Sequence, residues 1–208
     1  MSYSIIKYSE KYHEEWVKCR IEAFLDSSFY DDVYRTKKSD SYVQHSVELS
    51  FLSISEDKVI GFIDIEYETI PKTVCHLKGE LGAVMWHIGV LKEYRRQGVA
   101  KKLFDKVIAE LKKQDITRLE AWTQDDIPAN KWYLNQGFVH KESYLNAFIN
   151  GQLDDVKEYL NIAKIGSIFG IRRLNFEAPI ERKEELSKIC HRLHEVKLYE
   201  LELNEYVK

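Results

Sequence analysis

Cysteine-rich motifs, long apolar runs and an excess of basic charge are all missing from this chain of 208 residues. Its three cysteines lie far apart and match neither a zinc-binding nor a disulfide spacing, which favours a reducing compartment. No apolar run reaches membrane-spanning length, and the first residues lack the apolar segment of a secretory signal, so we expect a cytoplasmic protein with no membrane partner. With 31 basic and 34 acidic residues, the net charge of −3 argues against nucleic acid as a partner.

The spacing of the apolar residues predicts a mixed α/β domain. The expected elements are strands at 3–9, 80–90, 117–123 and 137–148, a hairpin over 47–70, and helices at 10–25, 98–113 and 128–136. The strand, helix and strand at 84–90, 98–113 and 117–123 predict a parallel crossover, which is right-handed in nearly all folds.

The residues after 148 are harder to interpret. Helices are expected at 152–164 and 181–195, and the alternating residues 197–203 predict a final strand that completes the sheet. We therefore divide the chain into a core over 1–148 and a C-terminal extension over 149–208. The extension has two open interpretations, as a cover for a substrate cleft or as the interface of a homodimer.

The stretch "HIGVLKEYRRQGVAKKLF" passes from an apolar strand through a basic, glycine-containing turn into a helix. The first turn of a helix presents unpaired backbone N–H groups at the positive end of the helix dipole, which suits phosphate. Gly98 lets an anion approach the backbone, Ala100 keeps the next position small, and Arg95, Arg96 and Lys101 add positive charge. The alternative is an ordinary helix start with a solvated basic edge.

Two motifs in this chain resemble those of the GNAT superfamily of acetyl-CoA-dependent N-acetyltransferases. One is Arg/Gln-x-x-Gly-x-Gly/Ala after an apolar strand, which stands here at residues 95–100. The other is the helix "ANKWYLNQGF" at 129–138, which follows after one further strand. The resemblance implies a GNAT fold, in which a twisted, mostly antiparallel sheet contains one splayed parallel strand pair and carries helices on both faces. The helical C-terminal extension would be added to that fold.

The resemblance also implies how acetyl-CoA would bind. It would lie where the strands ending at Val90 and Thr123 splay apart, with the diphosphate on the N–H groups of residues 96–101. The family often has Asn where this chain has Asp126, and Asn130 is the alternative for that contact. The residues implied in cofactor binding are Ile88, Val90, Arg95, Arg96, Gln97, Gly98, Val99, Ala100, Lys101, Asp126 and Asn130.

Acetyl transfer to an amine needs a proton for the departing thiolate and a base for the amine. Tyr133 matches the general-acid position of the family. Glu80 and Glu66 are the candidates for the base. Strand alternation places His87 on the face opposite Val84, although a β-bulge would change that face. We discount His87, because a lone histidine in a strand is more often a structural residue.

A strand in the predicted hairpin carries carboxylates at Asp64, Glu66 and Glu68 on one face. They are either an exposed sheet face or a negative cleft that attracts a cationic amine. If the face is only solvated sheet, the acceptor pocket is to be sought around Phe24, Phe29 and Tyr30.

Cys190, His191 and His194 are close together on a predicted helix, but we interpret them as a core cysteine and surface histidines, so no metal is expected. The favoured function is acetyl transfer from acetyl-CoA to a primary amine of a small molecule or peptide. The alternative is a catalytically silent acyl-CoA-binding or interaction module. A nucleotide-binding phosphate loop is disfavoured, because the turn lacks the Gly-Lys-Ser/Thr ending.

Overall fold

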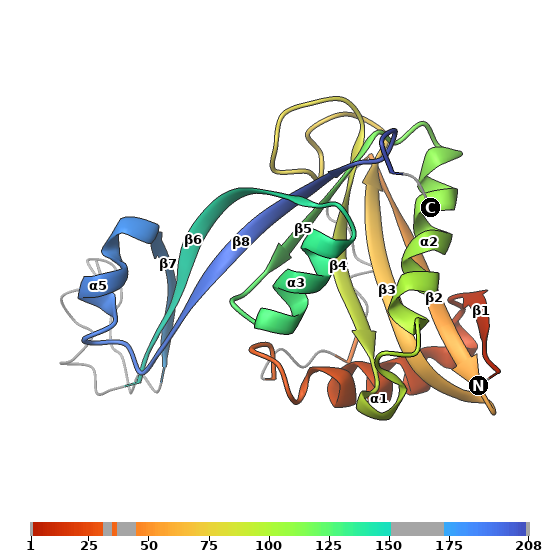
Figure 1. Cartoon of the computed structure of the whole chain (residues 1–208), viewed down its shortest axis with the longest axis horizontal. Coiled ribbons are helices and arrows are strands. Elements are labelled where there is room, and N and C mark those ends of the chain that lie inside the picture. The colour runs from red at the N-terminus through yellow and green to blue at the C-terminus, as the bar shows by residue number, and fades with distance from the viewer. Residues whose placement is uncertain (1, 31–34, 37–44, 151–172, 207–208) are drawn as a thin grey trace, which may run out of the picture.

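The computed structural model describes residues 2–30, 35–36, 45–150 and 173–206. Within these ranges the strands form one sheet in the order β1-β2-β3-β4-β5-β8-β6-β7 (Figure 1). The strands are β1 (Ser4–Lys7), β2 (Ser46–Ser55), β3 (Lys58–Glu68), β4 (Gly82–Val90), β5 (Arg118–Thr123), β6 (Val139–Ile149), β7 (Leu174–Pro179) and β8 (Arg192–Glu202). Every neighbouring pair is antiparallel except β4 and β5, so the predicted mixed sheet with one parallel pair is confirmed.

Helices cover both faces of the sheet, as predicted. They are α1 (His13–Phe24), α2 (Val99–Lys112), α3 (Ile127–Asn135) and the short α5 (Lys183–Leu186), with 3₁₀ turns at Glu10–Tyr12, Lys92–Tyr94 and Ile180–Arg182. Figure 1 shows α2 and α3 together on one face, and α1 packs on the other. No helix within the described ranges is both long enough and apolar enough to span a membrane.

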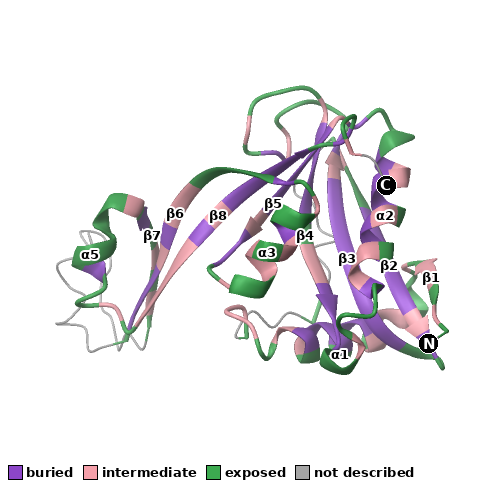
Figure 2. Ribbon diagram, in the orientation of Figure 1, coloured by how far each residue is buried: buried purple, intermediate pink, exposed green. Residues whose placement is uncertain are grey.

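The alternation of side chains in β3 contributes to a hydrophobic core on each face of the sheet. Phe62 packs with the α1 residue Trp16 in one buried cluster, whereas Ile63 and Ile65 pack with the α2 residue Leu103 in the other. Because successive strand residues point to opposite faces, one strand can serve both cores. Figure 2 shows the resulting buried residues running along the central strands, with exposed residues on the outer sides of the helices and in the loops.

The parallel pair separates before its strands end. The register between β4 and β5 stops at Met85 and Ala121, although β4 continues to Val90 and β5 to Thr123. We call this opening between the two strand ends the fork. Beside it, β4 contains a bulge at Trp86, because Met85 pairs with Ile65 and His87 with Asp64. The splay that the GNAT resemblance implied is therefore present.

At the other end of the pair, a buried charge network holds the loop between β3 and β4 (residues 69–81). The Arg118 guanidinium is hydrogen-bonded to Glu120 at 2.5 Å and Glu200 at 3.2 Å, and it donates to the Leu77 carbonyl at 2.8 Å. The Glu120 carboxylate accepts the N–H groups of His76 and Leu77. Arg118, Glu120 and Glu200 are each at least nine-tenths buried, so their charges depend on one another.

Glu68 belongs to the same region. Its carboxylate accepts the backbone N–H groups of Val74, Cys75 and Gly82. Burial alone would raise the pKa of Glu68, but these three hydrogen bonds together with the Arg118 charge hold that pKa below its usual value. The Glu68 side chain therefore anchors the loop rather than facing a cleft.

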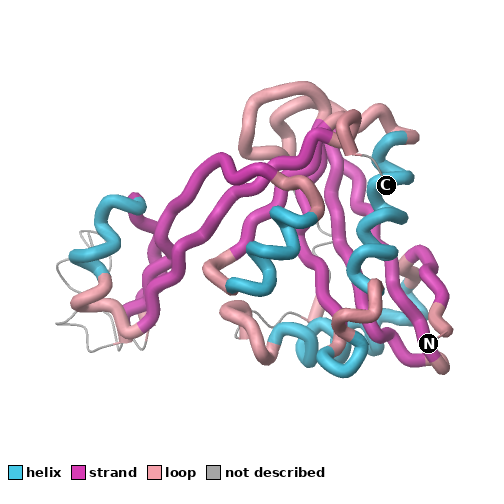
Figure 3. The backbone as a smooth tube through the Cα atoms, in the orientation of Figure 1, coloured by secondary structure: helices cyan, strands magenta, loops and turns pink. Residues whose placement is uncertain are grey.

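The last strand lies inside the sheet. β8 pairs with β5 over Lys197–Glu202 and with β6 over a longer stretch that continues past the end of β5. Figure 3 shows β6 and β8 leaving the rest of the sheet as a long two-stranded ribbon, with β7 and α5 at its far part. The division of the chain at 148/149 stays a prediction, but β8 joins the sheet between two strands of the proposed core.

The helix predicted over 181–195 is wrong beyond its first residues. The helical structure ends with α5 at Leu186, and residues from Arg192 onward form β8. Leu186 and Leu193 belong to one hydrophobic cluster, and their seven-residue spacing is typical of one face of a helix. They contact that cluster from different elements, α5 and β8. The helix predicted over 152–164 lies outside the described residues.

Replacing Arg118 by Met should lower the free energy of unfolding by about 3–5 kcal/mol, because Glu120 and Glu200 then remain buried without their cation. Urea denaturation measures this difference. Lys106→Met is the control, since Lys106 pairs with Glu110 at the surface and its loss should cost less than about 1 kcal/mol. Equal effects of the two substitutions would show that the network is not a coupled unit.

Candidate functional site

The basic turn lies directly after β4, at the open end of the fork. Arg96 and Gly98 have φ values of 61° and 79°, in the left-handed region, and α2 begins at the next residue, Val99. Among the described residues, no side chain caps the N-terminus of α2, and a Cβ atom added at Gly98 would meet no atom within 4 Å. This geometry is compatible with an anion on the N–H groups of the turn, and the anion site stays a prediction.

Two of the basic residues in the turn already have partners. Arg95 donates from Nε to the Val90 carbonyl at 3.0 Å and from its terminal nitrogen to the Ala23 carbonyl at 2.9 Å, so it ties the turn to β4 and α1. Lys101 lies 2.5 Å from Asp105 and 2.9 Å from the Tyr206 hydroxyl. Burial alone would lower the pKa of Lys101, but these two hydrogen bonds raise it above its usual value.

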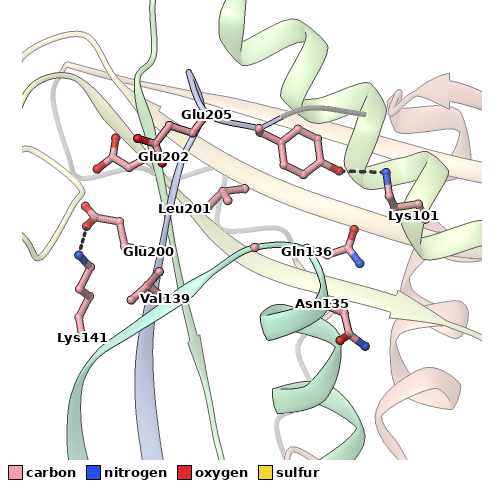
Figure 4. Close-up of a pocket in the computed structure, with 11 residues that line it drawn as sticks. Lys101, Asn135, Gln136, Val139, Lys141, Glu200, Leu201, Glu202 and Glu205 are labelled. Carbon is pink, nitrogen blue, oxygen red and sulfur yellow. Dashed lines mark hydrogen bonds and ion pairs between the residues drawn. The ribbon is translucent and has the colours of Figure 1, made fainter.

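Lys101 also lines a pocket of about 470 Å³ between the start of α2, the end of α3 and the end of β8. Figure 4 shows three carboxylates from the β8 end of the chain gathered on one side of it and Lys101 on the other. The lining residues are Lys101, Asn135, Gln136, Gly137, Val139, Lys141, Glu200, Leu201, Glu202, Glu205 and Tyr206. Of the predicted site residues, Lys101 alone lines this pocket.

Asp126 and Asn130, the residues at the start of α3 that are predicted to contact the cofactor, are hydrogen-bonded to other groups of the protein. The Asp126 carboxylate accepts the backbone N–H and the hydroxyl of Ser28, in the loop after α1. Asn130 donates to the carbonyls of Gln124 and Asp126 and accepts the Tyr199 hydroxyl at 2.7 Å. Asp126 therefore links α1 to α3, and Asn130 fixes the segment between β5 and α3.

The loop after α1 crosses from one arm of the fork to the other. On the β4 side, Asp26 lies 3.0 Å from Lys92. On the β5 side, Ser28 is bound by Asp126, and Arg192 of β8 donates to the Ser28 carbonyl at 3.1 Å and the Tyr30 hydroxyl at 3.0 Å. These contacts connect the loop to both strand ends.

Tyr133 lies in α3, on the α2 side of the sheet. Its side chain is 6% exposed and stacks on Tyr199, with ring centroids 5.5 Å apart and planes 11° from parallel. Burial, with a smaller contribution from Tyr199, raises the pKa of the Tyr133 phenol well above its ordinary value. The phenol therefore keeps its proton, and no hydrogen bond to it is found among the described residues.

The acidic face of β3 is buried, so its interpretation as an exposed sheet face is wrong. Asp64 and Glu66 are each 8% exposed. Glu66 accepts hydrogen bonds from Trp86 Nε1 at 2.9 Å and from the Ser46 hydroxyl at 2.5 Å. Asp64 accepts from Trp16 Nε1 at 3.3 Å. Glu66 thus orients the bulged tryptophan of β4, on the α1 side of the fork.

His87 is the residue that sequence reasoning undervalued. The bulge at Trp86 moves His87 onto the face of Asp64, with His87 Nδ1 at 3.5 Å from Asp64 Oδ2. Arg20 approaches the other ring nitrogen at 3.4 Å, and Phe24 packs against the ring with centroids 6.2 Å apart. The assignment of His87 to the face opposite Val84 is therefore wrong. A bulge leaves no reliable signal in a single sequence.

Glu80 lies elsewhere. It is exposed, it precedes β4, and its backbone carbonyl accepts a hydrogen bond from Arg118. That places Glu80 at the end of β4 opposite the turn. The structure thus places the turn directly after β4, His87 of β4 on the α1 side of the sheet, Tyr133 of α3 on the α2 side, and Glu80 at the opposite end of β4.

The cluster of Cys190, His191 and His194 also separates. His194 is in β8, where Nδ1 lies 2.7 Å from Asp125 and Nε2 accepts from Arg192, while Cys190 belongs to the small cluster with Leu186. Among the described residues, no group of three or more His, Cys, Asp and Glu side chains is arranged to hold a metal ion.

Comparison with known proteins agrees with this geometry. The family model "Acetyltransferase (GNAT) family" matches residues 9–138. The chain is 26% identical to N-alpha-acetyltransferase 30 of Schizosaccharomyces pombe over 149 residues, which are 71% of this chain and 91% of the relative.

Solved structures share the fold at low identity. The ribosomal-protein-S18-alanine N-acetyltransferase of Escherichia coli superimposes with a TM-score of 0.55 at 14% identity, covering 97% of this chain and 94% of that one. The PaiA N-acetyltransferase of Thermoplasma acidophilum, solved in complex with coenzyme A, gives a TM-score of 0.53 at 18% identity, covering 68% and 92%.

Proposed function

The chain belongs to the GNAT family of acetyltransferases, and we propose that it transfers an acetyl group from acetyl-CoA to a primary amine of a small molecule or peptide. The observation that carries this proposal is the fork between β4 and β5, which opens toward the uncapped N-terminus of α2. A phosphate-bearing thioester fits such a site, because the turn can bind its diphosphate and the fork can bind its pantetheine arm.

The residues at the fork fit this cosubstrate. Beyond Met85, β4 has no strand partner on its β5 side among the described residues, so the backbone of Ile88 and Val90 borders the opening. The N–H groups of residues 96–101 and the Arg96 side chain would hold the diphosphate. Bound there, acetyl-CoA supplies the acetyl group as a reactive thioester. Arg95 and Asp126 support this site through the contacts with Ala23 and Ser28, and the Lys101 side chain would have to leave Asp105 to join it.

Two residues at the fork can move the protons. His87, with Asp64 beside its Nδ1, would take a proton from the amine at Nε2 on the α1 side, which requires the Arg20 guanidinium, 3.4 Å from that nitrogen, to move aside. The amine reaches the thioester in its neutral form, after losing its ammonium proton to solvent. Its nitrogen bonds to the carbonyl carbon while the carbon–sulfur bond breaks. The excess proton on that nitrogen passes to His87, and the Tyr133 phenol gives its proton to the departing sulfur. Solvent returns the proton from His87 to Tyr133, so the net products are an amide and a thiol.

The acceptor approaches from the α1 side in this scheme. Asp64 and Glu66 lie on that face, and their charge favours a protonated amine. One relative is named an N-alpha-acetyltransferase, which supports an α-amine as the first acceptor to test.

The experiment is thiol release from acetyl-CoA with a panel of amines: a peptide with a free α-amine, spermidine and kanamycin. Release that depends on one amine class supports the proposal. Binding of CoA in calorimetry without amine-dependent release would instead support the silent acyl-CoA-binding alternative.

Gly98→Asp should raise the Kd of CoA at least about 100-fold. The new carboxylate repels the diphosphate, and the hydrogen bonds lost to a charged group contribute about 1.5–3 kcal/mol each. Calorimetry measures the Kd. Gly98→Ala is the control for backbone strain at positive φ and should weaken binding far less. A near wild-type Kd for the Asp variant would place the diphosphate elsewhere.

Tyr133→Phe should lower turnover by about 10²–10⁴-fold while the Kd of CoA changes little, because the ring packing on Tyr199 is kept and the proton is lost. The raised pKa of Tyr133 also means that its deprotonation causes no loss of rate between pH 6 and about pH 9 in the wild type. Tyr144→Phe is the control, as that tyrosine packs on Trp122 instead. Unchanged turnover, with chemistry rate-limiting, would mean that another group protonates the sulfur.

His87→Gln should lower turnover by about 10²-fold or more, because the ring that accepts the amine proton is gone. Glu66→Gln should have a smaller effect on turnover and should mainly raise the KM of the amine, since its carboxylate orients Trp86. Glu80→Gln, at the far end of β4, serves as the matched control and should stay within about twofold of wild type. A loss in Glu80→Gln as large as in His87→Gln would reverse this assignment of the base.

A further inference from the structure

A buried polar side chain without a partner follows directly after β5. Gln124 is 4% exposed, and its carbonyl oxygen Oε1 has no hydrogen-bond partner within the part of the chain that the structure describes. An unpaired amide oxygen in a protein interior is unfavourable, and native structures keep few of them. A ligand that donates an N–H group would remove that cost.

Gln124 lies on the arm of the fork. It follows Thr123, the last residue of β5, and β5 has already left β4 after Ala121. In register, Glu66 of β3 stands beside Val84 of β4, and Val84 stands beside Glu120 of β5, so these residues share one face. Alternation along β5 carries that face as far as Trp122, and Gln124 lies two residues further, just past the end of the strand.

The surroundings of Gln124 are fixed. Its backbone carbonyl accepts a hydrogen bond from Asn130 at 2.7 Å, and Asn130 is itself held by the Tyr199 hydroxyl. The next residue, Asp125, is paired with His194 at 2.7 Å. A polar group held in place before a ligand arrives loses little entropy when the ligand binds. The backbone of Gln124 is therefore held in place before a ligand arrives.

We propose that Gln124 is a binding residue of the fork whose Oε1 accepts a hydrogen bond from an N–H group of a substrate. The inference rests on the proposed function. Two substrates offer such a donor: the pantetheine arm of acetyl-CoA, through its amides, and the acceptor, through its amine. A neutral amide suits this position, because a buried carboxylate without a partner would be far more costly.

The test replaces Gln124 by Met, which keeps the length of the side chain and removes the amide. The matched control is Ser53→Ala, since Ser53 Oγ is also buried without a partner among the described residues but lies in β2, outside the fork. Calorimetry gives the Kd of CoA, and thiol release gives the KM of the panel amine that the wild type acetylates fastest. Thermal melts give the Tm with and without CoA.

If the pantetheine amides are the donors, Gln124→Met should raise the Kd of CoA about five- to tenfold, which is the loss of one hydrogen bond. If the acceptor is the donor, the Kd of CoA stays at the wild-type value and the KM of the amine rises by a similar factor. In either case the Tm without ligand should not fall, because the unsatisfied atom has gone. Ser53→Ala should leave both constants unchanged.

Unchanged Kd and KM in Gln124→Met would overturn the inference, and so would a lower Tm with unchanged affinities, because Gln124 would then be only structural. A wild-type protein that binds no CoA contradicts the proposed function and this inference together. Wild-type binding with an unaffected variant contradicts the inference alone.

Discussion

The separation of β4 from β5 is the constraint on which the rest of the structure depends. Two parallel strands that stay paired satisfy each other's backbone groups and leave no room for a ligand. Here the pairing stops at Met85 and Ala121, and the bulge at Trp86 bends β4 at that same point. The opening, the direction of the turn into α2 and the position of His87 on the acidic face all follow from this one irregularity.

An open fork needs its two arms held at a fixed distance. At the paired end, Arg118, Glu120 and Glu200 join β5 and β8, and the Arg118 guanidinium also binds the loop that leads into β4. At the open end, the loop after α1 is bound to both arms, through Asp26 and Ser28. The buried charges at one end and the surface contacts at the other thus both constrain the angle between β4 and β5.

The sequence predicted the arrangement well where a repeating pattern carried it. Alternation in the hairpin and the helical spacing in α2 each match an element of the structure, and the glycine turn lies where the strand ends. The failures have a common physical origin. The face of the sheet on which His87 lies depends on one bulged residue. Leu186 and Leu193 have the spacing of a helical face, although they belong to α5 and β8. In both cases the deciding contact is between strands or elements distant in sequence, which local periodicity does not report.

The residues beyond 148 also change how the fork is understood. The family model ends at residue 138, yet β8 supplies Tyr199, which stacks on Tyr133 and binds Asn130. The same strand supplies His194, paired with Asp125, and Arg192, bound to the loop after α1. The helix α3, the segment that precedes it and the loop after α1 are therefore each in contact with this one late strand. A boundary at 148/149 separates the chain by sequence pattern, whereas the physical support of the site crosses it, so a chain cut there would lose the contacts that position its own phenol.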